Sequence, residues 1–319
     1  MSLAVVFPGQ GSQTVGMGRE LALAFPAARM LFEEVDEALQ QHLARLIWEG
    51  PESDLTLTEN AQPALMAVSL AVMRVLETEG GWRLAERAAF VAGHSLGEYS
   101  ALAAAGALTV ADAARLLKLR GQAMQKAVPV GVGAMAALLG VDIDQARDIA
   151  ANASGDDPVT GDKRICAAAN DNAPGQVVVS GHRAAVERAI AIAAERGFKR
   201  SVMLPVSAPF HCELMRPAAD TMAKALAESN LRAPAVPLVA NVTAEPTSDP
   251  IEIRGLLIEQ ITATVRWRES VLAMRAAGVD RLVEAGAGKV LAGLARRIDK
   301  ELIATSLGTP ADIEALLKS

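Results

Sequence analysis

The pentapeptide Gly-His-Ser-Leu-Gly at positions 93–97 constrains the fold of this chain more than any other segment. It follows the apolar run 88–92 and precedes a segment with helical apolar spacing, which predicts a strand, a tight turn and a helix in that order. On such a turn the serine is held above the sheet, and glycines flank it because neighbouring elements pass too close for a side chain. Amides at the start of the helix can stabilise negative charge at the same spot. Ser95 is therefore a candidate nucleophile.

Size and composition predict a large α/β core. The chain has 319 residues, of which 51% are hydrophobic and 3% aromatic, so Ala, Leu, Val and Ile must fill the core. Such a core suits helices packed on a parallel sheet. The net charge of −6, without blocks of like charge, argues against a nucleic-acid partner.

The cysteines and the N-terminal segment predict a cytoplasmic protein. Cys166 and Cys212 lie far apart in the sequence and form no C-x-x-C motif, so we expect two unpaired thiols in a reducing compartment. The apolar run 3–7 stops at Pro8 and follows no basic segment, so we expect no secretory signal. Apolar stretches are too short to span a bilayer, and we expect no membrane partner.

Hydrophobic periodicity predicts two structural units. Along 131–204 the pattern reads strand, helix, strand, strand, helix, strand, which is the order of a ferredoxin-like unit. We expect this unit to be inserted into a larger one formed by residues 1–130 and 205–319. In the larger unit we expect a strand at 3–7 before a glycine-rich loop, and a last long helix that opens after 286–288.

A serine hydroxyl needs a base within hydrogen-bond reach, and the chain has four histidines. His42 lies in an expected amphipathic helix, where a surface role is the simpler interpretation. His94 should leave the elbow in another direction than Ser95, and His182 lies in an expected turn of the inserted unit. His211 follows a strand downstream of the serine, the order in which an elbow serine meets its base. Elimination favours His211, with a structural histidine as the alternative.

No carboxylate identifies itself as a third catalytic group. Asp220 and Glu284 lie in plausible regions, but we interpret both as helix-end or strand-end carboxylates that face water. A backbone carbonyl can orient a histidine equally well. The position of the orienting group stays open at this point.

Two glycine-rich segments resemble nucleotide-binding loops, but neither completes its motif, and the sequence contains no metal-ligand motif. After Gly9 and Gly11, Thr14 stands where a dinucleotide fingerprint has its third glycine. Val283 and Val290 occupy the leading-glycine and hydroxyl positions of a phosphate loop, so that interpretation also fails. No His, Cys or carboxylate cluster has metal-ligand spacing. We interpret the loop around Gly9 as backbone brought close to a reacting group.

Arg120 lies in an expected helix at 116–127 with apolar neighbours. One interpretation is a surface arginine whose stem lies along apolar surface. The other is a guanidinium fork aimed at a substrate carboxylate. The spacing does not decide between them.

Taken together, these motifs resemble the malonyl-CoA:acyl carrier protein transacylases, with the acyltransferase domains of polyketide and fatty acid synthases as related families. The resemblance extends over essentially the whole chain. In one departure, Ala287 replaces a proline that is common between the two glycines. The matching segments are 7–13, 93–99, 119–121 with 124–125, 172–176, 209–211, Gln260 with 265–267, and Gly286 with 288–291.

The resemblance implies an α/β-hydrolase-like core with a parallel sheet and an inserted ferredoxin-like subdomain. It implies transfer of malonyl from malonyl-CoA to the phosphopantetheine thiol of acyl carrier protein through a malonyl-serine, a ping-pong cycle that supplies fatty acid synthesis. Coenzyme A enters as a thioester substrate, and no cofactor is implied. We expect a monomer that acts on these two partners.

The resemblance also implies the roles of individual residues. Ser95 is acylated, and His211 is its base, held by a main-chain carbonyl near Gln260. The backbone amides of Gln10 and Leu96 form the oxyanion hole. Gln260 itself matches the family's glutamine near the active site.

Two further residues concern the choice of acyl group. By resemblance, Arg120 grips the malonyl carboxylate, and Phe210 matches the malonyl-selecting version of its loop. The main alternative activity is a serine hydrolase or thioesterase that releases the acyl group to water. The pairs 199–200 and 296–297, the latter with Lys300, are candidate contacts for an acidic carrier protein.

Overall fold

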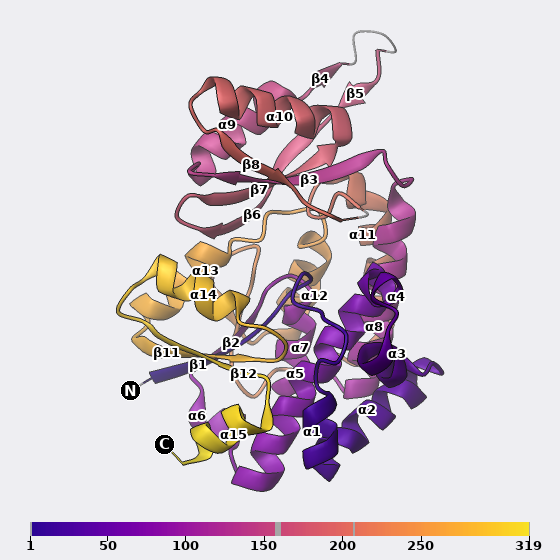
Figure 1. The fold of residues 1–319 in the computed structure, drawn as a ribbon, viewed down its shortest axis with the longest axis vertical. Helices are drawn as coiled ribbons and strands as arrows, with labels where there is room; N and C mark the ends of the chain where they lie inside the picture. The colour runs from indigo at the N-terminus through magenta and orange to yellow at the C-terminus, as the bar shows by residue number, and fades with distance from the viewer. Residues whose placement is uncertain (1, 157–160, 207, 319) are drawn as a thin grey trace.

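The computed structural model describes residues 2–156, 161–206 and 208–318, and it is a mixed α/β structure built on a six-stranded sheet (Figure 1). The central strands are parallel to one another, and the short edge strand β10 is antiparallel to its neighbour. This arrangement confirms the predicted parallel sheet. Across the sheet the strands are β10 (Pro246–Thr247), β9 (Leu238–Val239), β2 (Phe90–Gly93), β1 (Ser2–Phe7), β11 (Val279–Ala285) and β12 (Ile303–Leu307).

Helices cover both faces of this sheet, so alternate residues of β1 enter two hydrophobic cores. Val5 and Phe7 belong to the larger core, and Ala4 and Val6 to the smaller one. The helices of this part of the chain are α1 (Arg19–Ala24), α2 (Pro26–Leu39), α3 (Leu43–Glu49), α4 (Glu52–Thr56), α5 (Thr58–Gly80), α6 (Leu84–Arg87), α7 (Gly97–Ala104), α8 (Val110–Ala127), η1 (Glu213–Met215, a 3₁₀ helix), α11 (Arg216–Glu228), α12 (Pro250–Glu259), α13 (Trp267–Ala276), α14 (Val290–Ile298) and α15 (Pro310–Leu317).

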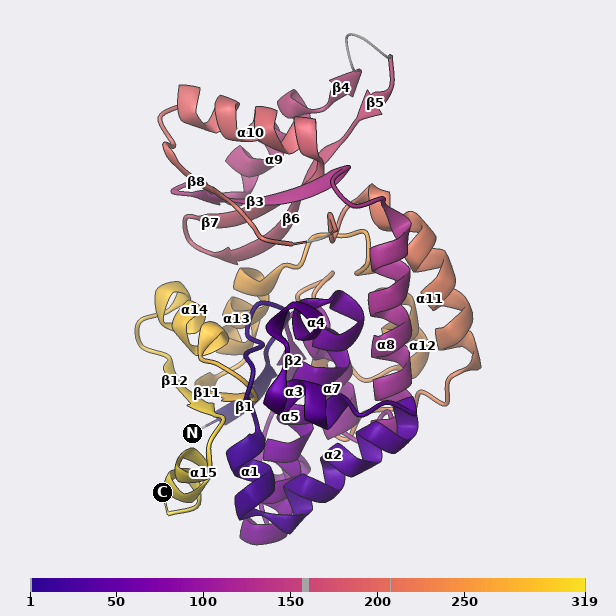
Figure 2. The same ribbon diagram turned by 45° about the vertical axis from the view of Figure 1, so that its right-hand side comes forward.

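A second, antiparallel sheet lies between α8 and α11 in the sequence and packs on two helices (Figure 2). Its elements follow the predicted order strand, helix, strand, strand, helix, strand, and the strands lie in the order β6-β7-β3-β8. A short pair of strands, β4 and β5, is added after the first helix. The elements are β3 (Gly133–Leu139), α9 (Ile143–Ala153), β4 (Gly155–Asp156), β5 (Lys163–Arg164), β6 (Cys166–Ala173), β7 (Gln176–His182), α10 (Arg183–Glu195) and β8 (Arg200–Met203).

Two predictions about helices are wrong. The helix after 286–288 is not the last element, because α14 ends at Ile298 and is followed by β12 and α15. Strand β12 extends the large sheet, and a capping box at Thr309 starts α15. His42 does not lie within a helix. Helix α2 ends before Gln40, whose left-handed backbone (φ 50°) turns the chain, and His42 is the residue that precedes α3.

None of the described helices combines the length and the apolar character needed to cross a bilayer.

Candidate active site

Strand β2, the turn at Ser95 and helix α7 form the predicted elbow. The φ of Ser95 is 55°, in the left-handed region that residues with side chains rarely adopt. A Cβ on Gly93 would lie 1.8 Å from the carbonyl carbon of Gly97, and a Cβ on Gly97 would lie 2.3 Å from the carbonyl oxygen of Phe7. Asn241, which lies elsewhere in the sequence, stabilises the turn. Its Oδ1 accepts a hydrogen bond from the Ser95 N–H at 2.8 Å, and its Nδ2 donates to the main-chain oxygen of Gly93 at 2.7 Å.

The structure brings His211 to the serine. The Oγ of Ser95 lies 2.8 Å from Nε2 of His211, and Nδ1 of the same ring lies 2.7 Å from the main-chain oxygen of Gln260. Because that carbonyl can only accept, Nδ1 carries the ring hydrogen and the Nε2 lone pair faces the serine. Burial, with the nearby Arg120 guanidinium, lowers the pKa of His211 to about 3. The ring is therefore neutral near pH 7 and able to accept a proton.

The group that orients His211 is thus a carbonyl, as the resemblance implied. Asp220 is exposed, as expected. The expectation that Glu284 faces water is wrong, because its side chain is buried and accepts the backbone N–H groups of Leu291 and Ala292 at the start of α14. Orphan N–H groups at a helix start attract a carboxylate, so Glu284 caps this helix.

Arg120 is buried, with 1% of its surface exposed, which excludes the surface interpretation. Its Nη2 donates to Ser95 Oγ at 3.1 Å and to Gln260 Oε1 at 2.7 Å, and its Nη1 donates to Gln62 Oε1 at 2.9 Å. A Cβ on Gly121 would lie 2.5 Å from the backbone of α5, so this glycine lets α8 approach α5 closely. Burial lowers the pKa of Arg120, but a guanidinium keeps its proton in proteins.

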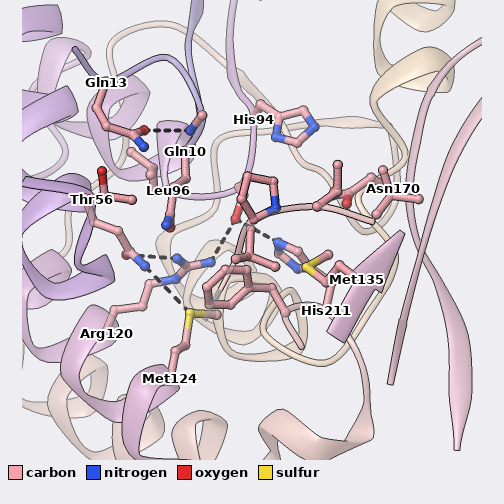
Figure 3. Close-up of a pocket in the computed structure, with 18 of the residues that line it drawn as sticks. Gln10, Gln13, Thr56, His94, Leu96, Arg120, Met124, Met135, Asn170 and His211 are labelled. Carbon is pink, nitrogen blue, oxygen red and sulfur yellow. Dashed lines mark hydrogen bonds between the residues drawn. The ribbon is translucent and has the colours of Figure 1, made fainter. Parts of the chain in front are cut away.

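A cavity of about 790 Å³ contains these groups (Figure 3). Ser95, Arg120, His211 and Phe210 line it, together with residues of the antiparallel sheet such as Met135. Phe210 is 8% exposed and forms part of the apolar wall. A serine, an imidazole and a buried cation thus meet in one cavity.

Gln10 and Leu96 line the same cavity. Among the described residues, neither of their backbone N–H groups donates a hydrogen bond, so both can donate to a ligand. A Cβ on Gly9 would lie 2.7 Å from the main-chain oxygen of His94, so the loop around Gly9 packs directly against the elbow. The loop around Gly9 thus lies beside the turn that carries Ser95, and its closeness to a reacting group stays a prediction.

Three polar residues of the site escaped the sequence analysis. Gln62 accepts a hydrogen bond from Arg120, Asn241 accepts one from the Ser95 N–H, and Glu98 accepts one from Gln260. Of the three, only Gln62 could have been noticed in the sequence, as a polar residue within the apolar run of α5. Burial raises the pKa of Glu98 to about 7.

His94 and His182 have partners other than Ser95. Nε2 of His94 lies 2.8 Å from Oδ1 of Asn172 on β6, and Nδ1 of His182 accepts the Ile165 N–H at 3.0 Å. Within the part of the chain that the structure describes, no group of three or more His, Cys, Asp or Glu side chains is placed to hold a metal ion.

Known proteins match this chain over nearly its whole length. The acyl transferase domain model matches residues 4–305. The malonyl CoA-acyl carrier protein transacylase of Bacillus subtilis (strain 168) is 43% identical over 317 residues, which cover 99% of this chain and 96% of the relative. The crystal structure of an acyl-carrier-protein-S-malonyltransferase from Bartonella henselae is 54% identical, covers 100% of this chain and 99% of that one, and superimposes with a TM-score of 0.95.

A second similar structure is a malonyl-transacylase in complex with its type II PKS acyl-carrier protein, which is 40% identical, covers 100% of this chain and 99% of that one, and has a TM-score of 0.93. The family match, the relatives and the full-length structural similarity agree with one another. The chain therefore belongs to the malonyl-CoA:acyl carrier protein transacylase family and is an acyltransferase.

Proposed function

We propose that this enzyme transfers malonyl from malonyl-CoA to the phosphopantetheine thiol of an acyl carrier protein, in a ping-pong cycle that supplies fatty acid synthesis. One observation carries the proposal: Oγ of Ser95 lies between Nε2 of His211, at 2.8 Å, and Nη2 of Arg120, at 3.1 Å. A nucleophile, its base and a buried cation thus meet in one cavity. The cation distinguishes this site from that of a general serine esterase.

In the first half-reaction, Ser95 Oγ attacks the thioester carbonyl of malonyl-CoA while His211 Nε2 takes the hydroxyl proton. The backbone N–H groups of Gln10 and Leu96 stabilise the oxyanion. The C–S bond then breaks, and His211 returns the proton to the departing coenzyme A thiolate. In the second half-reaction the carrier thiol attacks the malonyl-serine ester, and the same proton transfers run in reverse.

Arg120 and Phe210 select the acyl group in this proposal. The malonyl carboxylate pairs with the Arg120 guanidinium, whose partners in the free enzyme are the neutral Gln62, Gln260 and Ser95. Phe210 limits the space for branches on the acyl chain. An acetyl group gains nothing from the cation, so charge recognition favours malonyl.

We propose that the large unit, residues 1–130 and 205–319, is an α/β-hydrolase-like catalytic subdomain and that 131–204 is a ferredoxin-like subdomain. The elbow on a parallel sheet supports the first assignment, and the strand order β6-β7-β3-β8 with two helices on one face supports the second. A monomer stays a prediction. Location in the cytoplasm stays a prediction, and the two unpaired cysteines agree with it.

The function is tested by measuring coenzyme A release from malonyl-CoA with and without holo acyl carrier protein. We expect one rapid equivalent of coenzyme A without the carrier, continued turnover with it, and neither in Ser95→Ala. Ser100→Ala, a buried serine on α7 whose hydroxyl has no partner among the described residues, is the matched control and keeps both. Continued release without carrier would instead identify a hydrolase.

A further inference from the structure

Glu98 is a buried carboxylate next to the site that the proposed cycle does not use. It lies in the first turn of α7, and 1% of its surface is exposed. Its Oε1 accepts the backbone N–H of Asn241 at 2.7 Å, and its Oε2 accepts Nε2 of Gln260. Burying an acid costs free energy unless neighbouring groups compensate, so its presence here needs an explanation.

The Gln260 side chain connects Glu98 to Arg120. Its Nε2 donates to Glu98, and its Oε1 accepts from Arg120 Nη2 at 2.7 Å, so one amide group separates the two side chains. The hydrogen-bond partners of the Arg120 side chain itself are neutral: Gln62, Gln260 and Ser95. Their opposite charges also stabilise each other, since Arg120 opposes the rise in the pKa of Glu98 that burial causes.

We propose that Glu98 is the internal counter-ion of Arg120, acting through Gln260, and that the carboxylate of the incoming acyl group competes with it for the positive charge. This inference rests on the proposed malonyl transfer. A buried guanidinium without compensation would hold a malonyl carboxylate tightly and slow its release on the carrier arm. Glu98 weakens that hold, so the acyl group can be both selected and passed on.

The direction of the effect separates this role from a purely structural one. Removing the negative charge in Glu98→Gln leaves Arg120 uncompensated, so acylation should favour malonyl over acetyl more strongly than in the wild type. Gln260 and Arg120 both separate the Glu98 charge from the acyl carboxylate, and at the effective dielectric constant of a protein interior a charge at that separation changes the ratio of the two acylation rate constants by about tenfold. Loss of packing or of the Asn241 contact would slow both acylations in parallel and leave the ratio unchanged.

The test measures kcat/KM for acylation by malonyl-CoA and by acetyl-CoA at about pH 8, where most Glu98 is ionised. Glu284→Gln is the matched control, because Glu284 is equally buried and accepts hydrogen bonds from Leu291, Ala292 and Ser306 but lies outside the proposed site. We expect the malonyl-to-acetyl ratio to rise about tenfold in Glu98→Gln and to stay unchanged in Glu284→Gln. An unchanged or lower ratio in Glu98→Gln overturns the counter-ion role. A wild type without any malonyl preference would instead refute the proposed function.

If Glu98→Gln does not fold, the wild-type pH profile decides. The titratable groups around this network are Arg120 on α8, Tyr99 on α7, His211 after β8 and His94 beside Ser95. Burial lowers the pKa of His94 below its ordinary value of 6.5. Arg120 keeps its proton, burial raises the pKa of Tyr99 to about 12, and that of His211 is lowered to about 3. Between about pH 6 and about pH 8 the change is therefore ionisation of Glu98. The malonyl-to-acetyl ratio should fall as the pH rises, and a flat ratio contradicts the inference.

Discussion

Replacing Arg120 with alanine separates recognition of the acyl carboxylate from the chemistry at the serine. The guanidinium is buried and donates to Ser95 Oγ, where the proposed acyl ester forms. A charge-assisted contact with a buried carboxylate contributes about 3 kcal/mol, which corresponds to about a hundredfold in rate. Acetyl lacks the carboxylate, so losing the guanidinium removes this contribution from malonyl alone. Loss of the Nη2 hydrogen bond to Ser95 affects both substrates and cancels in their ratio.

The assay is single-turnover acylation, followed by coenzyme A release from malonyl-CoA and from acetyl-CoA. We expect the malonyl-to-acetyl ratio of rate constants to fall about a hundredfold in Arg120→Ala. Arg115→Ala, an exposed arginine on the same helix, should leave the ratio at the wild-type value. If Arg120→Ala unfolds at the wild-type temperature and its ratio changes by less than about threefold, which is under 1 kcal/mol, the proposed recognition of the carboxylate is refuted.

Three other perturbations test the fold, the base and the pocket. Gly97→Ala places a Cβ 2.3 Å from the Phe7 carbonyl oxygen and should destabilise the protein by about 3 kcal/mol or more. Gly255→Ala, in an open position of α12, should instead stabilise it by up to about 1 kcal/mol. Equal unfolding midpoints of the two variants in denaturant would contradict the close approach at Gly97. Because the pKa of His211 is about 3 when folded and 6.5 when unfolded, the unfolded chain takes up the proton first as the pH falls, so stability is lost below pH 6.5. The wild type should therefore lose up to about 1.4 kcal/mol per pH unit more than His211→Gln between about pH 6 and about pH 4, and parallel unfolding curves would count against the buried neutral ring. Phe210→Ala should raise methylmalonyl acylation relative to malonyl, as read from adduct masses, and an unchanged preference would remove Phe210 from the selection of the acyl group.

The sequence predicted the elements best where a pattern and a steric demand coincide. The elbow follows from two glycines that only a close backbone approach explains, and the element order of the small sheet follows from its hydrophobic periodicity. The prediction for the C-terminal segment is wrong because β12 has only five residues and its apolar and polar residues alternate weakly, so the pattern does not separate it from the preceding helix. The capping box at Thr309, which starts α15, was an available signal of a new helix.

The site was predictable only as far as residue types carry chemistry. Ser95 and His211 could be paired because few histidines competed, but the two interpretations of Arg120 depended on which face of α8 is buried. That face is set by the contact of Gly121 with α5, a tertiary feature. Glu98 falls within the matching segment 93–99, but Glu98 and Asn241 contact residues more than a hundred positions away, so no local pattern reveals what they contact.

The central claim, that Ser95 carries the acyl group between two thiols, is tested most directly by mass spectrometry of the intact protein. The enzyme is mixed with malonyl-CoA, freed of small molecules and then mixed with holo acyl carrier protein. The account predicts a malonyl adduct that maps to the peptide containing Ser95 and that moves to the carrier when the carrier is added. An adduct on another residue, or transfer to the carrier without any enzyme-bound malonyl, would contradict it.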